Sequence, residues 1–213
     1  MSTIYKHGSY EFKVVKKIGN GTFGEVYEVS LPNCDYRYAL KKFSPTSGMT
    51  DLTILLPNEL LRRFRQEISY QSECVHPNIV SICVFHDTDN PFFVMDYADA
   101  DLENLLITGM SKEEKISALL DVMNGLEYMH GKQLLHRDIK PANILKFGKT
   151  YKISDFGLIK NINENTHTQD INTNIFNVRK GMGTRDYMAP EVKIAGEYSE
   201  QTDIYALGVV MYE

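Results

Sequence analysis

The sequence holds few cysteines and no excess of basic charge. Three cysteines occur among 213 residues, widely spaced at Cys34, Cys74 and Cys83. Because they are odd in number and far apart, they indicate neither a disulfide framework nor a zinc site, and reduced thiols are expected. Lysine and arginine number 23 against 28 aspartate and glutamate, a net charge of −5. A nucleic-acid-binding face is usually basic, so nucleic acid is not an expected partner.

The sequence also lacks a targeting or membrane-spanning segment. No stretch approaches the roughly 18 consecutive apolar residues that a membrane-spanning helix needs. Lys6 and His7 near the start are followed by no apolar stretch, so a secretory signal is not expected. No membrane partner is therefore expected, and a cytoplasmic location is the default expectation.

The first hundred residues have the pattern of strands with one helix. β-Branched and aromatic residues predict strands at Tyr10 to Ile18, Val26 to Leu31, Tyr36 to Phe43, Ile79 to Phe85 and Phe92 to Tyr97. Ser44 to Thr53 is predicted to be a loop. A helix is expected after Pro57, with Leu60, Leu61, Phe64 and Ile68 at helical spacing.

From Leu102 onward the pattern changes to helix. Ser111 to His130 begins with a capping box, Ser111 and Glu114, and is predicted to bury the face that carries Ile116, Leu119, Leu120, Met123 and Leu126. Short strands are expected at Leu134-Leu135, Ile144-Leu145 and Tyr151 to Ile153, and a mobile loop at Asn161 to Asn177. A strand-rich lobe followed by a helical lobe predicts a ligand cleft between them, near Met95 to Ala98.

A glycine-rich loop lies between the first two predicted strands. Ile18 to Val26 reads I-G-N-G-T-F-G-E-V and matches G-x-G-x-x-G-x-V. Without side chains, the backbone N–H groups can approach phosphate oxygens closely. Alone, this pattern is more often a simple hairpin turn. A dinucleotide-binding loop would lead into a helix, whereas this one leads into a strand, which favours a kinase-type hairpin.

Two charged residues far apart in the sequence form a candidate pair. Tyr38 to Lys41 reads Y-A-L-K and fits V-A-I-K, with Lys41 at the end of a strand. A lysine there can bind phosphate oxygens if its flexible chain is oriented, and Glu67 on the predicted helix is the natural partner. Taken singly, each of the two residues is more simply interpreted as a solvated surface charge.

The strongest signal is a cluster of polar residues in the second half. His136 to Asn143 reads H-R-D-I-K-P-A-N, and Asp155-Phe156-Gly157 follows twelve residues further on. Phosphoryl transfer to a hydroxyl needs a carboxylate facing the incoming O–H, here Asp138, and metal ligands that bridge the phosphates. Asn143 and Asp155 are oxygen ligands of the kind that Mg²⁺ prefers. Lys140 can neutralise charge on the γ-phosphate.

These ordered motifs resemble those of the eukaryotic-type protein kinase superfamily. The resemblance runs from about Glu11 to the last residue and includes Ala189-Pro190-Glu191 and Asp203 to Gly208. It implies an α+β, protein-kinase-like bilobal fold. The N-lobe, residues 1–97, would be an antiparallel sheet with one helix, and the C-lobe, residues 98–213, would be mostly helical and lack its last helices.

The resemblance also implies ATP and Mg²⁺ as cofactors and a protein as substrate. Met95 would be the gatekeeper, Asp96 to Ala98 the hinge that hydrogen-bonds adenine, and Asp101 a ribose ligand. The implied nucleotide-binding residues are Ile18, Gly19, Asn20, Gly21, Thr22, Phe23, Gly24, Val26, Ala39, Lys41, Met95, Asp96, Ala98 and Asp101.

Two further segments resemble the serine/threonine subclass. Lys140 stands two residues after Asp138, where tyrosine kinases usually differ. Gly183 to Met188 resembles the substrate-docking loop, in which Thr184 would bridge Asp138 and Lys140. The implied catalytic set is Asp138, Lys140, Lys41, Glu67 and Thr184, with Asn143 and Asp155 as metal ligands.

Activation is the first departure from the family pattern. In many relatives Arg137 would pair with a phosphorylated residue about five positions before Thr184, but Arg179 stands there. Two hypotheses follow. Either a threonine of the Asn-rich segment, Thr166, Thr168 or Thr173, takes the phosphate, or no phosphate switch is used.

The second departure is the chain end at Glu213, inside a helix predicted to start near Asp203. Apolar surface would be exposed around Ala206, Leu207, Val209 and Val210. The chain is therefore expected to be a fragment, or to be completed by a C-terminal segment or a regulatory protein. One alternative to an active protein kinase is a pseudokinase that binds ATP without turnover. Another is a small-molecule kinase, against which the Thr184 loop and Ala189-Pro190-Glu191 argue because they resemble parts that dock a peptide.

Overall fold

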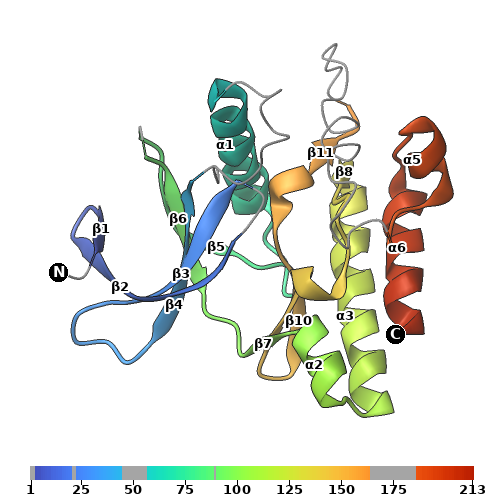
Figure 1. Ribbon diagram of the computed structural model, residues 1–213, viewed down its shortest axis with the longest axis horizontal. Helices are drawn as coiled ribbons and strands as arrows, with labels where there is room; N and C mark the ends of the chain where they lie inside the picture. The colour runs from blue at the N-terminus through green and yellow to red at the C-terminus, as the bar shows by residue number, and fades with distance from the viewer. Residues whose placement is uncertain (1–2, 21–22, 45–56, 89, 164–185) are drawn as a thin grey trace. The chain divides into compact units, whose positions relative to one another are not determined.

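The computed structural model describes residues 3–20, 23–44, 57–88, 90–163 and 186–213 (Figure 1). The chain divides into two compact units. The first unit comprises Met1–Val75 and Val80–Ala98, and the second comprises His76–Ile79 and Asp99–Glu213. Each unit has its own sheet and helices and is described separately below.

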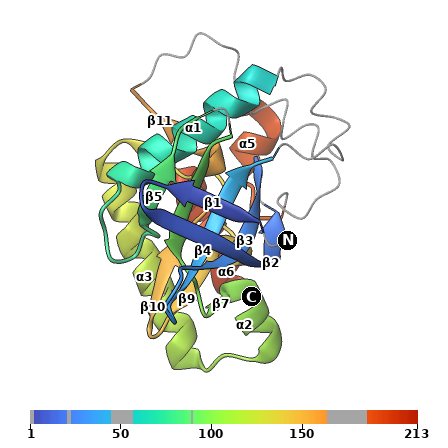
Figure 2. The same cartoon turned by 90° about the vertical axis from the view of Figure 1, so that its left-hand side faces the viewer.

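The first unit contains a six-stranded sheet in the order β1-β2-β3-β4-β6-β5, in which all neighbouring strands are antiparallel (Figure 2). Its strands are β1 (Ile4–His7), β2 (Tyr10–Asn20), β3 (Gly24–Ser30), β4 (Arg37–Phe43), β5 (Ile82–His86) and β6 (Phe92–Asp96). The predicted strands are confirmed, with ends shifted by a few residues. β1 was not predicted, because four residues with no clear alternation carry little signal.

One face of this sheet carries the core of the first unit. Because side chains alternate along a strand, residues two apart share a face. The buried cluster consists of Phe12, Val29, Leu40, Phe92 and Val94. The opposite face therefore carries the intervening residues, which include Val26, Glu28, Ala39 and Lys41.

The helix of the first unit is α1 (Pro57–Glu73). Leu60, Phe64 and Ile68 are buried as their spacing predicted, whereas Leu61 is half-buried. The same helix also buries Glu67, at 1% exposure. A carboxylate in such a place requires a partner, because removing an unpaired charge from water is costly. Apart from Ser44, the predicted loop Ser44 to Thr53 lies outside the described residues.

The second unit is mainly helical. Its two small sheets have the strand orders β10-β9-β7 and β11-β8. The antiparallel sheet of the first unit and the helices of the second confirm the predicted α+β class. The elements of the second unit are β7 (Ala100–Asp101), α2 (Leu102–Thr108), α3 (Lys112–Gly131), β8 (Leu134–Leu135), η2 (Pro141–Asn143), β9 (Ile144–Phe147), β10 (Thr150–Ile153), η3 (Phe156–Leu158), β11 (Lys160–Asn161), α5 (Pro190–Ala195) and α6 (Glu200–Tyr212).

The start of α3 was predicted correctly, but its buried face only in part, because Leu126 of the predicted face is buried at 1% exposure. Ser111 and Glu114 form the capping box. Three residues of the predicted face, Ile116, Leu120 and Met123, are about half exposed, at 48%, 55% and 51%. The residues that α3 buries are Ala118, Val122, Gly125, Leu126 and Met129.

The reason for this difference lies at Gly125. A Cβ atom there would stand 2.8 Å from Ile153 Cδ1 and 2.9 Å from the carbonyl oxygen of Asn78. The helix thus approaches β10 along its smallest residues, where backbones can come close. The helical spacing of large apolar residues, taken alone, had favoured the face with the larger side chains.

The last helix also differs from its prediction. α6 begins at Glu200, before the expected start near Asp203. Ala206, Leu207 and Val210 are buried, so the expectation that they are exposed was wrong. The half-exposed apolar residues of α6 are instead Ile204, Tyr205 and Met211. Within the described part of the chain, no helix combines the length and the apolar character needed to span a bilayer.

Candidate active site

In the first unit, Lys41 and Glu67 form a buried ion pair. Lys41 lies on β4 and Glu67 on α1, and Lys41 Nζ donates to Glu67 Oε1 at 2.5 Å. Their side chains are only 4% and 0% exposed. Because breaking a buried pair leaves an uncompensated charge, this contact ties α1 to β4 within the unit. The sequence predicted the pairing from two residues 26 positions apart.

The glycine-rich loop joins β2 and β3, so it is flanked by strands on both sides, as predicted. Gly21 and Thr22 lie outside the described residues. Gly24 has a packing reason to be glycine, since a Cβ atom there would stand 2.1 Å from the carbonyl oxygen of Lys42. Phe23 is fully buried, and its carbonyl oxygen accepts a hydrogen bond from the backbone N–H of Ser44 at 3.2 Å.

Three residues predicted to bind the nucleotide base lie on adjacent strands of the first unit. Val26 on β3 pairs in register with Lys41 on β4, and Ala39 on β4 pairs with Met95 on β6. Ala39 is buried, while Val26 and Met95 are half-buried. All three are on the face opposite to the core cluster.

The remaining predicted nucleotide ligands sit at the edges of these elements. Ile18 is 40% exposed, and Gly19 and Asn20 are the last residues of β2. Asp96 ends β6 and Ala98 is the last residue of the first unit. Asp101 belongs to the second unit and caps α2, with both of its carboxylate oxygens accepting hydrogen bonds from Asn104, at 2.8 and 2.7 Å.

The centre of the second unit's candidate site is the carboxylate of Asp138. Its Oδ2 accepts hydrogen bonds from Lys140 Nζ and from Asn143 Nδ2, both at 2.9 Å. Its Oδ1 is buried and has no hydrogen-bond partner among the residues that the structure describes. A buried polar atom without a partner is costly in a folded protein, so this oxygen is a ready acceptor for an incoming donor.

Asp203 holds the main chain on which this carboxylate is mounted. The backbone N–H groups of His136 and Arg137 donate to its two oxygens at 2.9 and 2.8 Å. The ring of His130 contacts the same carboxylate at 2.9 Å. Asp203 is only 1% exposed and lies near the start of α6. A helix distant in sequence therefore positions the loop directly before Asp138.

His136 fastens the same loop to the segment that leads to Asp155. Its Nε2 lies 3.0 Å from the carbonyl oxygen of Ser154, and its Nδ1 lies 3.3 Å from the backbone nitrogen of Asp138. A carbonyl can only accept and a backbone N–H can only donate. The contacts therefore assign the hydrogen to Nε2 and leave Nδ1 as the acceptor, the pattern of a neutral imidazole.

Asn143 and Asp155 are brought close together in the second unit. The backbone N–H and the hydroxyl of Ser154 both donate to the carbonyl oxygen of Asn143, at 2.9 and 3.0 Å. Because Asn143 Nδ2 donates to Asp138, its amide oxygen is left as the atom able to bind a metal. Asp155 has the left-handed backbone conformation, with φ of 60°. Such strain in a residue other than glycine is typical of functional sites.

Amide and carboxylate oxygens are hard donors, which fits Mg²⁺. This ion is usually held in proteins by one or two side chains while phosphates and water complete its shell. Asn143 and Asp155 thus have the chemistry that such an ion needs. Thr184, the remaining predicted catalytic residue, lies outside the described residues.

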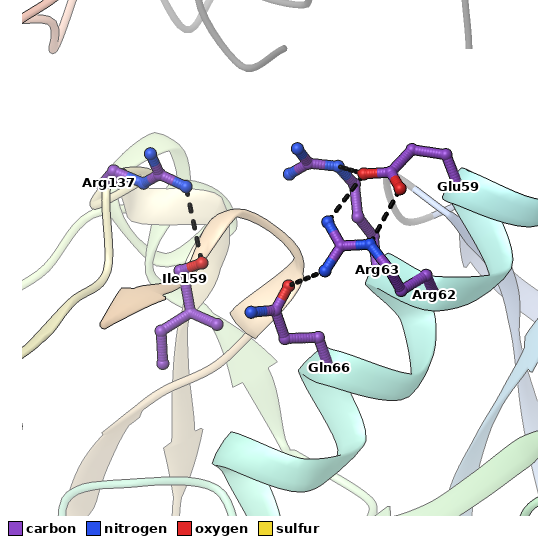
Figure 3. A network of polar contacts seen from close by, with 6 residues as sticks. All are labelled: Glu59, Arg62, Arg63, Gln66, Arg137 and Ile159. Atoms are coloured by element: carbon purple, nitrogen blue, oxygen red, sulfur yellow. Dashed lines mark hydrogen bonds and ion pairs between the residues drawn. The ribbon is translucent and has the colours of Figure 1, made fainter. Parts of the chain in front are cut away.

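The side chain of Arg137 is held by main-chain carbonyl groups at the end of η3, just before β11. Its Nε donates to the carbonyl oxygen of Leu158 at 2.6 Å. Its Nη2 donates to the carbonyl oxygen of Ile159 at 3.4 Å (Figure 3). The guanidinium also lies over the ring of Tyr198, 5.0 Å from its centroid. The backbone of Arg137 has a positive φ of 66°. The candidate phosphate acceptors Thr166, Thr168 and Thr173 are outside the described residues.

A separate charged network lies at the beginning of α1 (Figure 3). Glu59 accepts hydrogen bonds from Arg62 at 2.7 and 2.8 Å and from Arg63 at 3.2 Å. Arg62, followed by Arg63, lowers the pKa of Glu59 below its usual value. A carboxylate in the first turn also interacts favourably with the helix dipole, so the network stabilises this helix end.

Two residues that build the site were not predicted from the sequence. Asp203 was noted only as part of a motif, and its link to the backbone before Asp138 spans more than sixty residues. Ser154 looked like an ordinary residue before Asp155. An aspartate directly before the apolar run Ile204 to Met211 is the signal that could have identified Asp203, since a carboxylate drawn into the core with such a run must find donors.

Comparison with known proteins shows which family the chain resembles. A family profile described as "Protein kinase domain" matches residues 12–213. Proteins named Aurora kinase from Yarrowia lipolytica and Saccharomyces cerevisiae are 31% and 32% identical over 208 and 209 residues. A protein named serine/threonine-protein kinase PknD from Chlamydia muridarum is 35% identical over 236 residues. Each match covers 95% of this chain.

The relatives are longer than this chain. The chain spans 51% and 52% of the two Aurora kinases and 24% of PknD. The family profile begins at residue 12, so β1 lies before the matched residues.

Proposed function

The chain belongs to the protein kinase family, and we propose that it transfers the γ-phosphate of ATP to serine or threonine hydroxyl groups of proteins. The observation that carries this proposal is the state of Asp138. One oxygen of its carboxylate is engaged by Lys140 and Asn143, while the other is buried with no partner among the described residues. A hydroxyl group that donates to Oδ1 would give this oxygen the hydrogen bond that it lacks.

In this proposal, Asp138 receives the proton of the substrate hydroxyl as the oxygen attacks phosphorus. Lys140, whose Nζ lies 2.9 Å from Asp138 Oδ2, holds the carboxylate in place and supplies positive charge near the transferred group. Thr184 would bridge these two residues. Catalysis of this type depends mostly on positioning and electrostatic stabilisation, with a contribution of about 10²- to 10⁴-fold from the general base.

Mg²⁺ and ATP are the proposed cofactors. Asn143 and Asp155 would hold the ion, which supplies positive charge to the phosphate oxygens as the γ-phosphoryl group departs. Lys41, oriented by Glu67, would bind phosphate oxygens, and the main chain of Gly19 to Gly24 would donate to them. Ile18, Val26, Ala39 and Met95 would enclose the adenine, while the main chain of Asp96 and Ala98 would hydrogen-bond its edge.

The preference for serine and threonine rests on Lys140, on the Thr184 segment and on the similarity to the serine/threonine-protein kinase PknD. A protein substrate is proposed for the same reasons. Retention of Lys41, Asp138 and Asp155 argues against a pseudokinase, since these are the residues that inactive relatives often lose.

Acceptor-resolved phosphate transfer tests the proposal. Three degenerate peptide libraries, with serine, threonine or tyrosine as the only acceptor, are incubated with the protein, Mg²⁺ and γ-labelled ATP. Label is expected on the serine and threonine libraries, with Asp138→Asn as the blank. ATP binding without label on any library would favour the pseudokinase alternative, and label on tyrosine alone would overturn the assigned specificity.

The activation hypothesis has its own test. Mass spectrometry of active protein would locate phosphate on Thr166, Thr168 or Thr173 if such a switch exists. Full activity of the triple alanine variant would eliminate these threonines as the switch. In that case Arg137 would keep the contacts that it has in the structure, with the carbonyl oxygens of Leu158 and Ile159.

A further inference from the structure

A row of polar side chains crosses the first unit's sheet on the face that carries Ala39 and Lys41. The row consists of Lys16 on β2, Glu28 on β3, Arg37 on β4 and Tyr97 just after β6, and is called the Glu28 row below. Lys16 and Glu28 are paired in register. Lys16 Nζ lies 3.4 Å from Glu28 Oε2, and an Arg37 terminal nitrogen lies 3.9 Å from Oε1.

Glu28 is the fixed centre of this row. Its side chain is 8% exposed, whereas those of Lys16 and Arg37 are 62% and 56% exposed. A buried carboxylate needs compensating charge, because desolvation penalises its ionised form. Lys16 and Arg37 lie on either side of this carboxylate and supply that charge, so Glu28 restricts where the exposed Arg37 side chain lies.

Arg37 in turn covers the ring of Tyr97. Its guanidinium carbon lies 4.4 Å from the ring centroid, well within the range of a cation–π contact. The last paired residues of the β4–β6 ladder are Tyr38 and Asp96. Arg37 and Tyr97 occupy the next step of the same register. A side-chain stack therefore continues the connection between these segments where the strand pairing ends.

The residues beside this stack are those proposed to bind adenine. Glu28 pairs in register with Ala39, and Ala39 pairs with Met95. Tyr97 stands between Asp96 and Ala98, whose main chain is proposed to hydrogen-bond the base. A shift of Tyr97 would displace both of these main-chain groups together.

We propose that the Glu28 row is a positioning device for nucleotide recognition: Glu28 orients Arg37, and Arg37 clamps Tyr97 so that the main chain of Asp96 and Ala98 is held ready for adenine. This inference rests on the proposed function, because it presupposes an adenine nucleotide at that segment. In this proposal Glu28, Arg37 and Tyr97 are positioning residues: they act by holding the main chain and do not contact the reacting atoms.

The chemistry of arginine makes the idea testable. A guanidinium is planar and stacks on a ring, whereas a lysine ammonium is a compact, strongly hydrated charge. Arg37→Lys therefore keeps the charge beside Glu28 but weakens the clamp on Tyr97. Tyr97→Leu removes the ring, and Tyr97→Phe retains it. Arg65→Lys is the matched control, since Arg65 is similarly exposed and pairs with Asp87 elsewhere in the same unit.

The experiment is a calorimetric titration of each variant with ATP and, separately, with inorganic tripolyphosphate, both in the presence of Mg²⁺. Arg37→Lys and Tyr97→Leu should weaken ATP binding by roughly two- to fivefold, the range of one exposed cation–π contact. The affinity for tripolyphosphate should not change, because this ligand has no adenine to contact the main chain of Asp96 and Ala98. Tyr97→Phe and Arg65→Lys should bind ATP like the unsubstituted protein. In Arg37→Lys and Tyr97→Leu, KM for ATP should rise while kcat stays within about twofold.

The double variant Arg37→Lys/Tyr97→Leu should be no weaker than either single variant, since both remove the same contact. Equal loss of ATP and tripolyphosphate affinity, additive losses, or unchanged ATP affinity in both single variants would overturn the inference while leaving the proposed function intact. No ATP binding by the unsubstituted protein would overturn the proposed function, and this inference with it.

Discussion

The two units hold their candidate catalytic residues by different means. In the second unit, Asp138 and Asn143 are fixed largely through main-chain groups, with the backbone before Asp138 bound to the carboxylate of Asp203. In the first unit, Lys41 and Glu67 meet through the ends of two long side chains from separate elements. The geometry of the second unit therefore follows directly from the path of its backbone. That of the first depends on where α1 lies against β4.

The largest effect is expected for Asp203→Ala. The change leaves the buried N–H groups of His136 and Arg137 without an acceptor, and it removes the partner of His130. At about 1–3 kcal/mol for each of the three lost contacts, the free energy of unfolding should fall by about 3–9 kcal/mol. Urea unfolding measures this loss.

Asp99→Ala is the matched control for that prediction. Asp99 also accepts a hydrogen bond from a backbone N–H, that of Gly148 at 2.7 Å, but it is exposed. Its replacement should cost less than about 1 kcal/mol, because water can take over the bond. Both residues belong to the second unit, so similar losses in the two variants would show that burial of the bonds to Asp203 is not what fixes the backbone there.

A somewhat smaller effect is expected for Lys41→Met in the first unit. Glu67 would remain buried without the ammonium group that faces it, and breaking a buried ion pair typically costs about 3–5 kcal/mol. ATP turnover should fall as well. Lys42→Met is the control on the same strand, since Lys42 pairs with Glu25 at a more exposed position. The two variants are compared by thermal unfolding, and equal losses would show that burial of the pair is not what matters.

Two glycines of the glycine-rich loop are expected to have different roles, Gly24 in packing and Gly19 in binding a ligand. Gly24→Ala places a Cβ atom 2.1 Å from the carbonyl oxygen of Lys42, so backbone must shift, at a cost of about 1–3 kcal/mol. At Gly19 the nearest atom to an added Cβ is 4.0 Å away. Gly19→Ala should therefore leave the unfolding temperature almost unchanged. Equal destabilisation in both variants would contradict this account of Gly24.

The sequence motifs predicted much of the site because each motif carries residue types that the chemistry needs at set spacings. The pairing of Lys41 with Glu67 and the strand–loop–strand setting of the glycine-rich loop are confirmed. What motifs do not contain was missed. The buried face of α3 depends on the close approach at Gly125, and the role of Asp203 depends on hydrogen bonds between distant segments. Both are properties of packing in three dimensions.

The smallest effect is expected from the pH dependence of Glu25. Hydrogen bonds from Lys17, then Lys42 and Tyr27, lower the pKa of Glu25 from 4.5 to about 2. The ionised carboxylate therefore stabilises the folded hairpin above about pH 4.5, and this contribution is lost as the pH falls toward about 2. At neutral pH, Glu25→Gln should cost less than about 1 kcal/mol.

Urea unfolding of Glu25→Gln and the unsubstituted protein across this pH range tests the sign. The difference between them should shrink as the solution becomes more acidic. In Lys17→Met, which removes the main donor, an NMR titration should show the Glu25 pKa closer to its usual value. A difference that grows toward low pH would contradict the assigned contacts.

The central claim is that Asp138 acts on the substrate hydroxyl and not in nucleotide binding. The most direct measurement is the single-turnover rate of phosphoryl transfer for Asp138→Asn, taken together with its affinity for Mg-ATP. The account predicts an affinity within about twofold of the unsubstituted protein and a transfer rate lower by about 10²- to 10⁴-fold. An unchanged transfer rate with the fold and nucleotide affinity intact would contradict it.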